Sequence, residues 1–279
     1  LESNLNISEK WILSRLTKTI ENYNHQLDRF HFNEAAKVLY EFTWNDFCDW
    51  YVEIAKLSFY GEDLQKANNA RSVSIKCLQT ILKLLHPYAP FITEELWQNF
   101  KPKNASDLII TQWPSPITYH NDIIELEISS LKNIITAIRA VRSRMNIPNS
   151  KPINLYVKCD KEKENFLSRQ MNLLKNFTVA EEVFIDPDTK KPTNSATVIS
   201  NGIEFYIPLS GLVDLEKEKK RMKKRLQEIE KLLISISGKL SNQNFLDRAP
   251  EEVISREKNN QSMLTEEKEK LLANLEIFE

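Results

Sequence analysis

The stretch "WNDFCDWYVEIAK" (residues 44–56) decides whether the first part of the chain folds as a helix bundle or builds an active site. Placed on a helix, Phe47, Trp50 and Ile54 recur three and four residues apart, the spacing of a face that packs into a core. Leu57 continues this face by three residues. The pattern therefore predicts a core-facing helix.

Cys48 lies on the flank of this predicted face. A nucleophilic cysteine needs a base within hydrogen-bond reach or a cationic setting that lowers its pKa. Its helical neighbours three and four residues away are Trp44, Asn45, Tyr51 and Val52, none of which is a base. We interpret Cys48 as structural. A second, exposed strip remains to face a ligand, and it consists of Asp49, Val52, Glu53 and Lys56, with Glu53 and Lys56 spaced to form an ion pair.

Helical periodicity extends outward from this stretch over residues 1–147. Ser8 can cap the first helix, and Gly61 ends the second. Pro90 suits the first turn of a short helix. The predicted long helices cover residues 8–27, 33–60, 69–86 and 122–146. The sequence thus predicts a mainly α protein whose first domain is a helical bundle.

The pattern changes after Pro148, so we predict a small α+β domain over residues 148–211. A β-rich run at 153–159 and a predicted strand at 183–185 flank a helix at 161–175. Two further β-rich runs surround Asn201-Gly202, a strong hairpin signal because both turn positions need positive φ.

The last part, residues 212–279, is predicted to form an antiparallel coiled-coil arm. Its first helix repeats apolar residues four and three apart, and residues 241–250 interrupt the repeat before a second helix. Residues 214–240 hold nine Lys/Arg against five Asp/Glu, and residues 247–279 hold five against nine, so the two helices can attract each other. The seam residues are Met222, Leu226, Ile229, Leu233, Ile236 and Leu240.

Two basic clusters remain open to alternative interpretations. Seven of the nine residues 217–225 are basic, and they either form a solvated face paired with the acidic second helix or contact phosphates. Arg139 and Arg142 share a helical face, which is either solvated or a nucleic-acid contact.

Composition excludes several classes of function. The net charge of −1 gives no global attraction for nucleic acid, so any such binding needs a local patch. The three cysteines and four histidines show no zinc-ligand spacing, and scattered cysteines favour a reducing compartment. No apolar run is long enough to span a membrane, and no glycine-rich phosphate loop is present. The first residues carry no signal-peptide pattern and no initiator Met, so we expect a start within a longer protein.

Several blocks of the sequence form a recognisable set, including "LYEFTWNDFCDWYVEIAK", "LLKLLHPYAPFITEELWQ", "IRAVRSRMNIP" and "GKLSNQNFLDRAPEEVISREK". Together they resemble the C-terminal region of the valyl-tRNA synthetase family, and the resemblance covers nearly the whole chain. It implies an anticodon-binding helical domain of the class I synthetase type, followed by a coiled-coil arm that braces tRNA.

The resemblance also implies roles for individual residues. On the anticodon side the candidates are Asp49, Val52, Glu53, Lys56, Arg139 and Arg142. On the arm they are Lys217, Lys219, Lys220, Arg221, Lys223, Lys224, Arg225, Lys239 and Arg248.

The class I signature motifs and an editing domain are absent from these residues. The resemblance therefore implies a fragment without catalytic residues, metal or cofactor, whose parent would use ATP and Mg to attach valine to tRNA(Val) in the cytoplasm. The expected partners are tRNA(Val) and the rest of that synthetase, with no membrane and no DNA.

Two alternatives stay open. One is the matching region of an isoleucyl- or leucyl-tRNA synthetase, whose helical blocks are similar. The other is a non-enzymatic coiled-coil interaction protein, which the heptads alone would allow.

Overall fold

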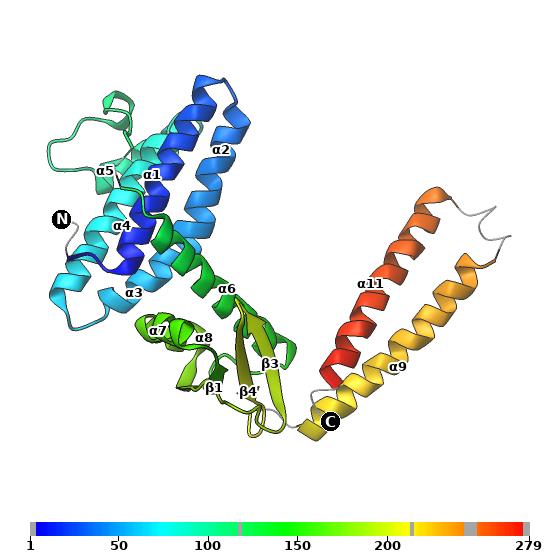
Figure 1. Cartoon of the computed structure of the whole chain (residues 1–279). Coiled ribbons are helices and arrows are strands. Elements are labelled where there is room, and N and C mark those ends of the chain that lie inside the picture. Colours follow the sequence, from blue (N-terminus) through cyan, green and yellow to red (C-terminus); the bar gives the residue numbers. More distant parts are fainter. Residues whose placement is uncertain (1–3, 117–118, 213–214, 243–249, 276–279) are drawn as a thin grey trace. The chain divides into compact units, whose positions relative to one another are not determined.

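The computed structural model describes residues 4–116, 119–212, 215–242 and 250–275 (Figure 1). The chain divides into two compact units, Leu1–Lys132 and Asn133–Glu279, and each is described by itself. This boundary falls inside the helix α6 (Asp122–Arg144). The division into domains at residues 147/148 and 211/212 stays a prediction.

The first unit is the expected helical bundle. Pro90 occupies the first turn of α5, as predicted. The bundle helices before α6 are α1 (Ile7–Asp28), α2 (Phe32–Glu41), η2 (Phe42–Val52), α3 (Glu53–Phe59), α4 (Leu64–Leu85) and α5 (Pro90–Phe100), and a short 3₁₀ turn, η3 (Leu108–Ile110), follows.

The start of α1 differs from the prediction that Ser8 caps it. The cap is Asn6, whose side chain accepts hydrogen bonds from the backbone N–H groups of Ser8 and Glu9. Glu9 returns a bond by accepting the N–H of Asn6 at 2.8 Å, which completes a capping box. Ser8 is therefore the second residue of the helix and lies buried.

The predicted helix at residues 33–60 is interrupted by a π-helix, η2. Its i→i+5 hydrogen bonding adds roughly one residue to each turn. Accordingly Phe42, Phe47 and Tyr51, five and four residues apart, point into the core. Phe47 and Ile54 are buried as predicted. Leu57 is 40% exposed, so its assignment to the core face was wrong. The buried residues of α3 are Ile54 and Ala55, and Leu57 follows Ala55 by two residues, which turns it away from the core.

The core of the first unit joins α1, α2, η2 and α4. Leu16, Ile20 and Tyr23 of α1 are buried in it, as their spacing predicted. The Tyr23 hydroxyl donates a 2.7 Å hydrogen bond to the carbonyl of Leu84 in α4. This bond satisfies the one polar atom of a fully buried side chain.

The second unit contains a four-stranded mixed sheet in the order β2-β1-β4-β3. β1 pairs parallel to β2 and antiparallel to β4, and β3 and β4 form the expected hairpin. Asn201 and Gly202 at its turn have φ of 53° and 68°, as the hairpin signal required. The strands are β1 (Ile153–Lys158), β2 (Ala180–Ile185), β3 (Ser195–Ser200) and β4 (Ile203–Pro208), with α7 (Lys161–Arg169) and α8 (Met171–Thr178) between β1 and β2.

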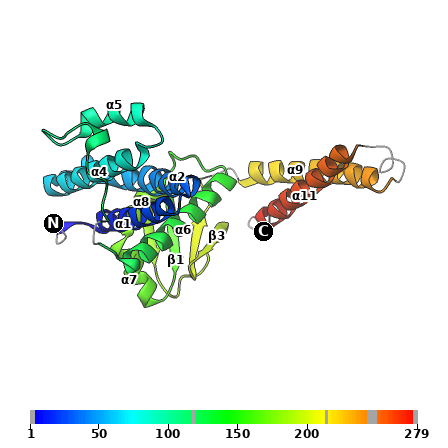
Figure 2. The same ribbon diagram turned by 90° about the horizontal axis from the view of Figure 1, so that it is seen from above.

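The arm consists of α9 (Leu215–Leu240) and α11 (Glu251–Leu275), which lie side by side in Figures 1 and 2. Ion pairs between Arg225 and Glu267 and between Lys239 and Glu257 fix an antiparallel arrangement. Met222, Ile229 and Ile236, seven residues apart, are buried, and the other predicted seam residues of α9 are half-buried. The seam prediction is confirmed, whereas supercoiling of the pair stays a prediction.

In the described ranges no helix combines the length and the apolar character that a membrane crossing requires.

Candidate functional site

The outer face of α2, η2 and α3 carries a continuous exposed strip. Tyr40, Trp44, Asp49 and Glu53 are all exposed along it. Their spacing of four, five and four residues follows the change from α-helical to π-helical turns and back. The strip therefore carries aromatic rings at one end and carboxylates at the other.

The structure places the four predicted strip residues as follows. Asp49, Glu53 and Lys56 are exposed, whereas Val52 is half-buried and packs against the core. Lys56 Nζ donates a 2.6 Å hydrogen bond to Glu53, so the predicted pair forms. Both side chains of this pair are exposed, so the pair contributes little to stability.

Sequence reasoning missed Tyr40 and Trp44. Their rings stack with centroids 6.4 Å apart and an interplanar angle of 20°, and their residues are 64% and 55% exposed. Exposed, nearly parallel aromatic rings are a surface on which an unstacked nucleobase can lie. Nothing in the sequence signals their exposure, because Tyr40 and Trp44 precede Phe47 by seven and three residues, the α-helical spacing of the apolar face.

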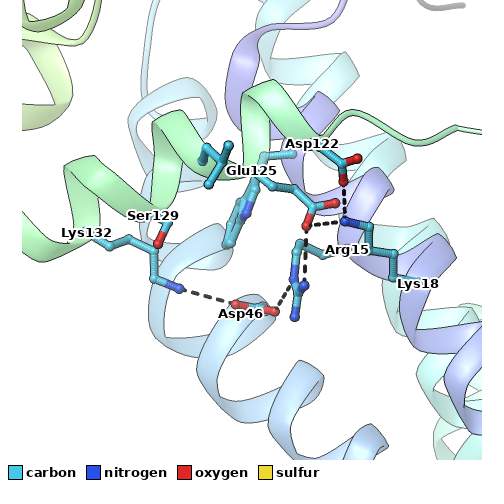
Figure 3. A pocket seen from close by; sticks show the side chains of 9 residues that line it. Arg15, Lys18, Asp46, Asp122, Glu125, Ser129 and Lys132 are labelled. Atoms are coloured by element: carbon cyan, nitrogen blue, oxygen red, sulfur yellow. Dashed lines mark hydrogen bonds and ion pairs between the residues drawn. The ribbon is translucent and has the colours of Figure 1, made fainter.

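Behind the strip, Asp46 anchors η2 to its neighbours (Figure 3). Its carboxylate accepts a 2.8 Å bond from Arg15 Nε of α1 and a 3.2 Å bond from Lys132 Nζ of α6. Lys132 also lies 5.1 Å from the ring centroid of Trp11 and 5.2 Å from that of Trp50. These contacts hold three helices together through one buried carboxylate.

A second carboxylate, Glu125, completes the network. It bonds to Ser14, Lys18 and Arg15, and Lys18 also bonds to Asp122 at 2.6 Å. Burial alone raises the pKa of Glu125, but these hydrogen bonds and charges outweigh it and lower the pKa. Burial likewise lowers the pKa of Arg15, and the neighbouring carboxylates outweigh that effect and raise it.

The cavity that these residues line has a volume of about 550 Å³. Its charged side chains are three acids and three bases, namely Asp46, Asp122, Glu125, Arg15, Lys18 and Lys132. Because the opposite charges already pair, the cavity has no net attraction for an anion. We interpret this network as support for η2.

Cys48 has no catalytic setting. It is half-buried, and burial together with the charge of Asp49 raises the pKa of its thiol. A raised pKa keeps the sulfur protonated and therefore a poor nucleophile at neutral pH. Among the described residues no group of three or more His, Cys, Asp or Glu is placed to hold a metal ion.

Arg139 and Arg142 do lie on one face of α6, in the second unit, and both bind the end of α8. Arg139 Nε donates to the Phe177 carbonyl at 2.7 Å. Arg142 donates to the carbonyls of Thr178, Pro148 and Lys151 at 3.1, 2.7 and 2.7 Å.

Arg142 is only 3% exposed, and burial lowers the pKa of its guanidinium. Its assignment as an RNA contact is therefore corrected, because buried donors that bind carbonyls do not reach a phosphate. Arg139 is exposed, so its RNA contact stays a prediction.

The predicted basic residues of the arm lie on α9, apart from Arg248, which is outside the described residues. Arg225 donates two hydrogen bonds to Glu267, at 2.8 and 3.0 Å, and Lys239 donates one to Glu257 at 2.9 Å. These two residues therefore hold the helix pair together. A shallow hollow of about 650 Å³ is lined by Lys217, Lys219, Lys220, Lys223 and Glu216. Of the remaining candidates, Arg221 and Lys224 are exposed.

Comparison with known proteins shows two family matches. Residues 9–157 match the anticodon-binding domain of tRNA ligase, and residues 214–278 match the valyl tRNA synthetase tRNA binding arm. The first match covers more than half of the chain. The first matched range contains the exposed strip. The second contains the basic face of α9, which consists of Lys217, Lys219, Lys220 and Lys223.

Similar curated proteins carry the name valine--tRNA ligase. The Listeria monocytogenes protein is 36% identical over 274 residues, which are 98% of this chain and 31% of the relative. The Enterococcus faecalis protein is 37% identical over 254 residues, covering 90% of this chain and 29% of the relative. The Bacillus subtilis protein is 34% identical over 260 residues, covering 92% and 29%. The chain thus spans about 30% of the length of these relatives.

Proposed function

The chain belongs to the family of anticodon-binding domains of tRNA ligases, and on that premise we propose that it is the tRNA-binding part of a valine--tRNA ligase. The observation that carries this proposal is the presence of both family matches, 9–157 and 214–278, in one chain. An anticodon-binding domain alone would leave the amino acid open, whereas the arm match bears the valyl name.

The two surfaces suit different parts of one RNA. The strip on α2, η2 and α3 offers aromatic rings and hydrogen-bonding carboxylates, which suit unstacked bases of a loop. The basic face of α9 offers lysines without a matching number of acids, which suits a phosphate backbone. Base contacts would then select the tRNA, and phosphate contacts would position it.

The parent enzyme would join valine to tRNA(Val) in the cytoplasm, using ATP and Mg bound by other residues of the parent. This chain would hold the tRNA while that part carries out the reaction. Its partners would be tRNA(Val) and the rest of the synthetase. We expect no valine activation by the chain itself, and we expect neither DNA nor a membrane as a partner.

Binding to two transcripts tests the proposal. The affinity of the chain for tRNA with a valine anticodon is compared with that for an unrelated tRNA, over a series of salt concentrations. We expect tighter binding of the valine tRNA at every salt concentration and weaker binding of both as salt increases. Equal affinities would leave only the electrostatic part of the proposal, and no binding at low salt would refute it.

A further inference from the structure

A groove beside the exposed strip has no role in the network around Asp46. It runs between α2 and the end of α4, within the first unit, and its volume is about 530 Å³. That volume lies within the range of roughly 300–1,000 Å³ that small-molecule sites occupy. The lining residues are Ala36, Lys37, Leu39, Tyr40, Thr43, Leu85 and Tyr88.

Aromatic rings form part of the groove wall. Tyr40 and Tyr88 are 64% and 40% exposed, so their rings are accessible to a ligand. Trp44 stacks on Tyr40 and extends the aromatic surface onto the strip. The Tyr88 hydroxyl donates a 2.8 Å hydrogen bond to the Phe32 carbonyl, which fixes that ring to α2 before any ligand arrives.

The polar groups of the groove are few. Lys37 is the one charged residue among its lining residues, and its amino group lies 3.9 Å from Glu41. The Thr43 hydroxyl is buried without a hydrogen-bond partner among the described residues. An apolar, ring-lined groove with a cation and no carboxylate in its wall suits a flat heteroaromatic ring linked to a phosphate.

We propose that this groove receives an unstacked nucleobase of the tRNA anticodon loop, stacked against Tyr40, with Lys37 near its phosphate. The proposal rests on the proposed function and assigns a base-binding site within it. It adds Tyr88 and Lys37 to the residues that face RNA. The neighbouring cavity around Asp46 is a poorer receptor, because its three acids and three bases pair with each other.

The test uses the 279-residue chain and a valine anticodon stem-loop RNA with 2-aminopurine at each loop position in turn. Stacking on a tyrosine quenches this fluorescent base. The variants are Tyr40→Leu, which removes the ring, and Tyr40→Phe, which keeps it. Phe100→Leu is the matched control, because Phe100 is also an exposed aromatic residue, at 40% against 64% for Tyr40, and lies at the far end of α5, outside the groove. Circular dichroism verifies that each variant is folded.

We expect one loop position to be quenched by the wild-type chain and by Tyr40→Phe and Phe100→Leu. Tyr40→Leu should abolish the quenching and weaken stem-loop binding by roughly 5- to 150-fold, the range for losing one base stack. Unchanged quenching and affinity in folded Tyr40→Leu would overturn the groove assignment.

Full-length tRNA separates this failure from failure of the proposed function. If the wild-type chain binds valine tRNA selectively and Tyr40→Leu binds it equally well, the groove assignment is wrong and the proposed function stands. If the wild-type chain binds neither the tRNA nor the stem-loop at low salt, both are wrong.

Discussion

The carboxylate of Asp46 in η2 accepts a hydrogen bond from Arg15 of α1 at 2.8 Å. The same carboxylate also bonds to Lys132, so one side chain connects the π-helical segment to two neighbouring helices. The exposed strip lies on the outer side of this segment. Its geometry therefore depends on an ionic contact that touches no ligand.

Replacing Asp46 by Ala should destabilise the fold. The change leaves Arg15 and Lys132 without their shared carboxylate, whose side chain is only 12% exposed. Loss of hydrogen bonds to charged groups predicts a decrease of about 1.5–3 kcal/mol in the free energy of unfolding, measured in urea. Asp49→Ala, on the exposed side of the same segment, is the control and should change stability by about 0.5 kcal/mol or less. Equal effects of the two variants would contradict the anchoring role.

Arg142→Ala should reduce stability without changing tRNA affinity. Its guanidinium binds the carbonyls of Thr178, Pro148 and Lys151, which the substitution leaves unpaired. The expected cost is about 2–4 kcal/mol, against about 1 kcal/mol for the more exposed Arg139→Ala. Thermal or urea unfolding gives the cost, and tRNA binding is measured on folded protein. A large loss of affinity in a folded Arg142 variant would restore the RNA-contact assignment.

Protonation of the Glu125 carboxylate at low pH should contribute to unfolding of the chain. Its pKa is lowered in the folded state, so the stabilisation is complete above the ordinary glutamate pKa of about 4.5 and is lost as the pH falls through the lower folded value. Unfolding free energies between pH 6 and about pH 3 should therefore fall more steeply for the wild type than for Glu125→Gln. Glu95→Gln, on the exposed face of α5, serves as the control and should keep the wild-type slope. A Glu125→Gln profile parallel to the wild type would argue against this contribution.

The lysines of α9 should set the salt dependence of tRNA binding. Changing Lys219, Lys220 and Lys223 to Gln removes three positive charges from the hollow. The slope of log K against log salt should decrease by about one for each phosphate that the arm can no longer bind. Changing Lys158, Lys190 and Lys191, which are exposed outside the arm, to Gln makes the same charge difference and should leave the slope nearly unchanged. Equal slopes for the two triple variants would indicate a general charge effect and not a contact by the arm.

Regular, local signals made most of the fold predictable. The Asn201-Gly202 turn and the seven-residue repeat of Met222, Ile229 and Ile236 each depend on neighbouring residues, and the structure has both. The site was less predictable. The burial of Asp46 depends on Arg15 and Lys132, which lie 31 and 86 residues away in sequence. Likewise, Arg142 is buried and bonded to a backbone carbonyl because α8 ends beside α6.

The candidate site residues also divide into those whose exposure the local sequence pattern predicts and those whose exposure only the fold reveals. Asp49, Glu53 and Lys56 are exposed as predicted, because helical periodicity fixes which side chains face outward over short distances. Tyr40 and Trp44 were missed, because large aromatic residues are usually assigned to a core. Only the three-dimensional arrangement shows that these rings are exposed and stacked on each other.

The π-helix η2 changes the angular position of the residues of α3 around the helix axis relative to those of α2. An α-helix turns by about 100° per residue, and a π-helix by roughly 20° less, so the eleven residues of η2 accumulate about half a turn of difference. If α-helical turns continued from the buried residues Leu39 and Phe42, the side chains of Asp49, Glu53 and Lys56 would face the core. The wide turns let one chain bury Phe47 and Tyr51 and still keep those charges in water. A single-residue deletion within η2 would therefore reset the angular position of every later residue of the segment.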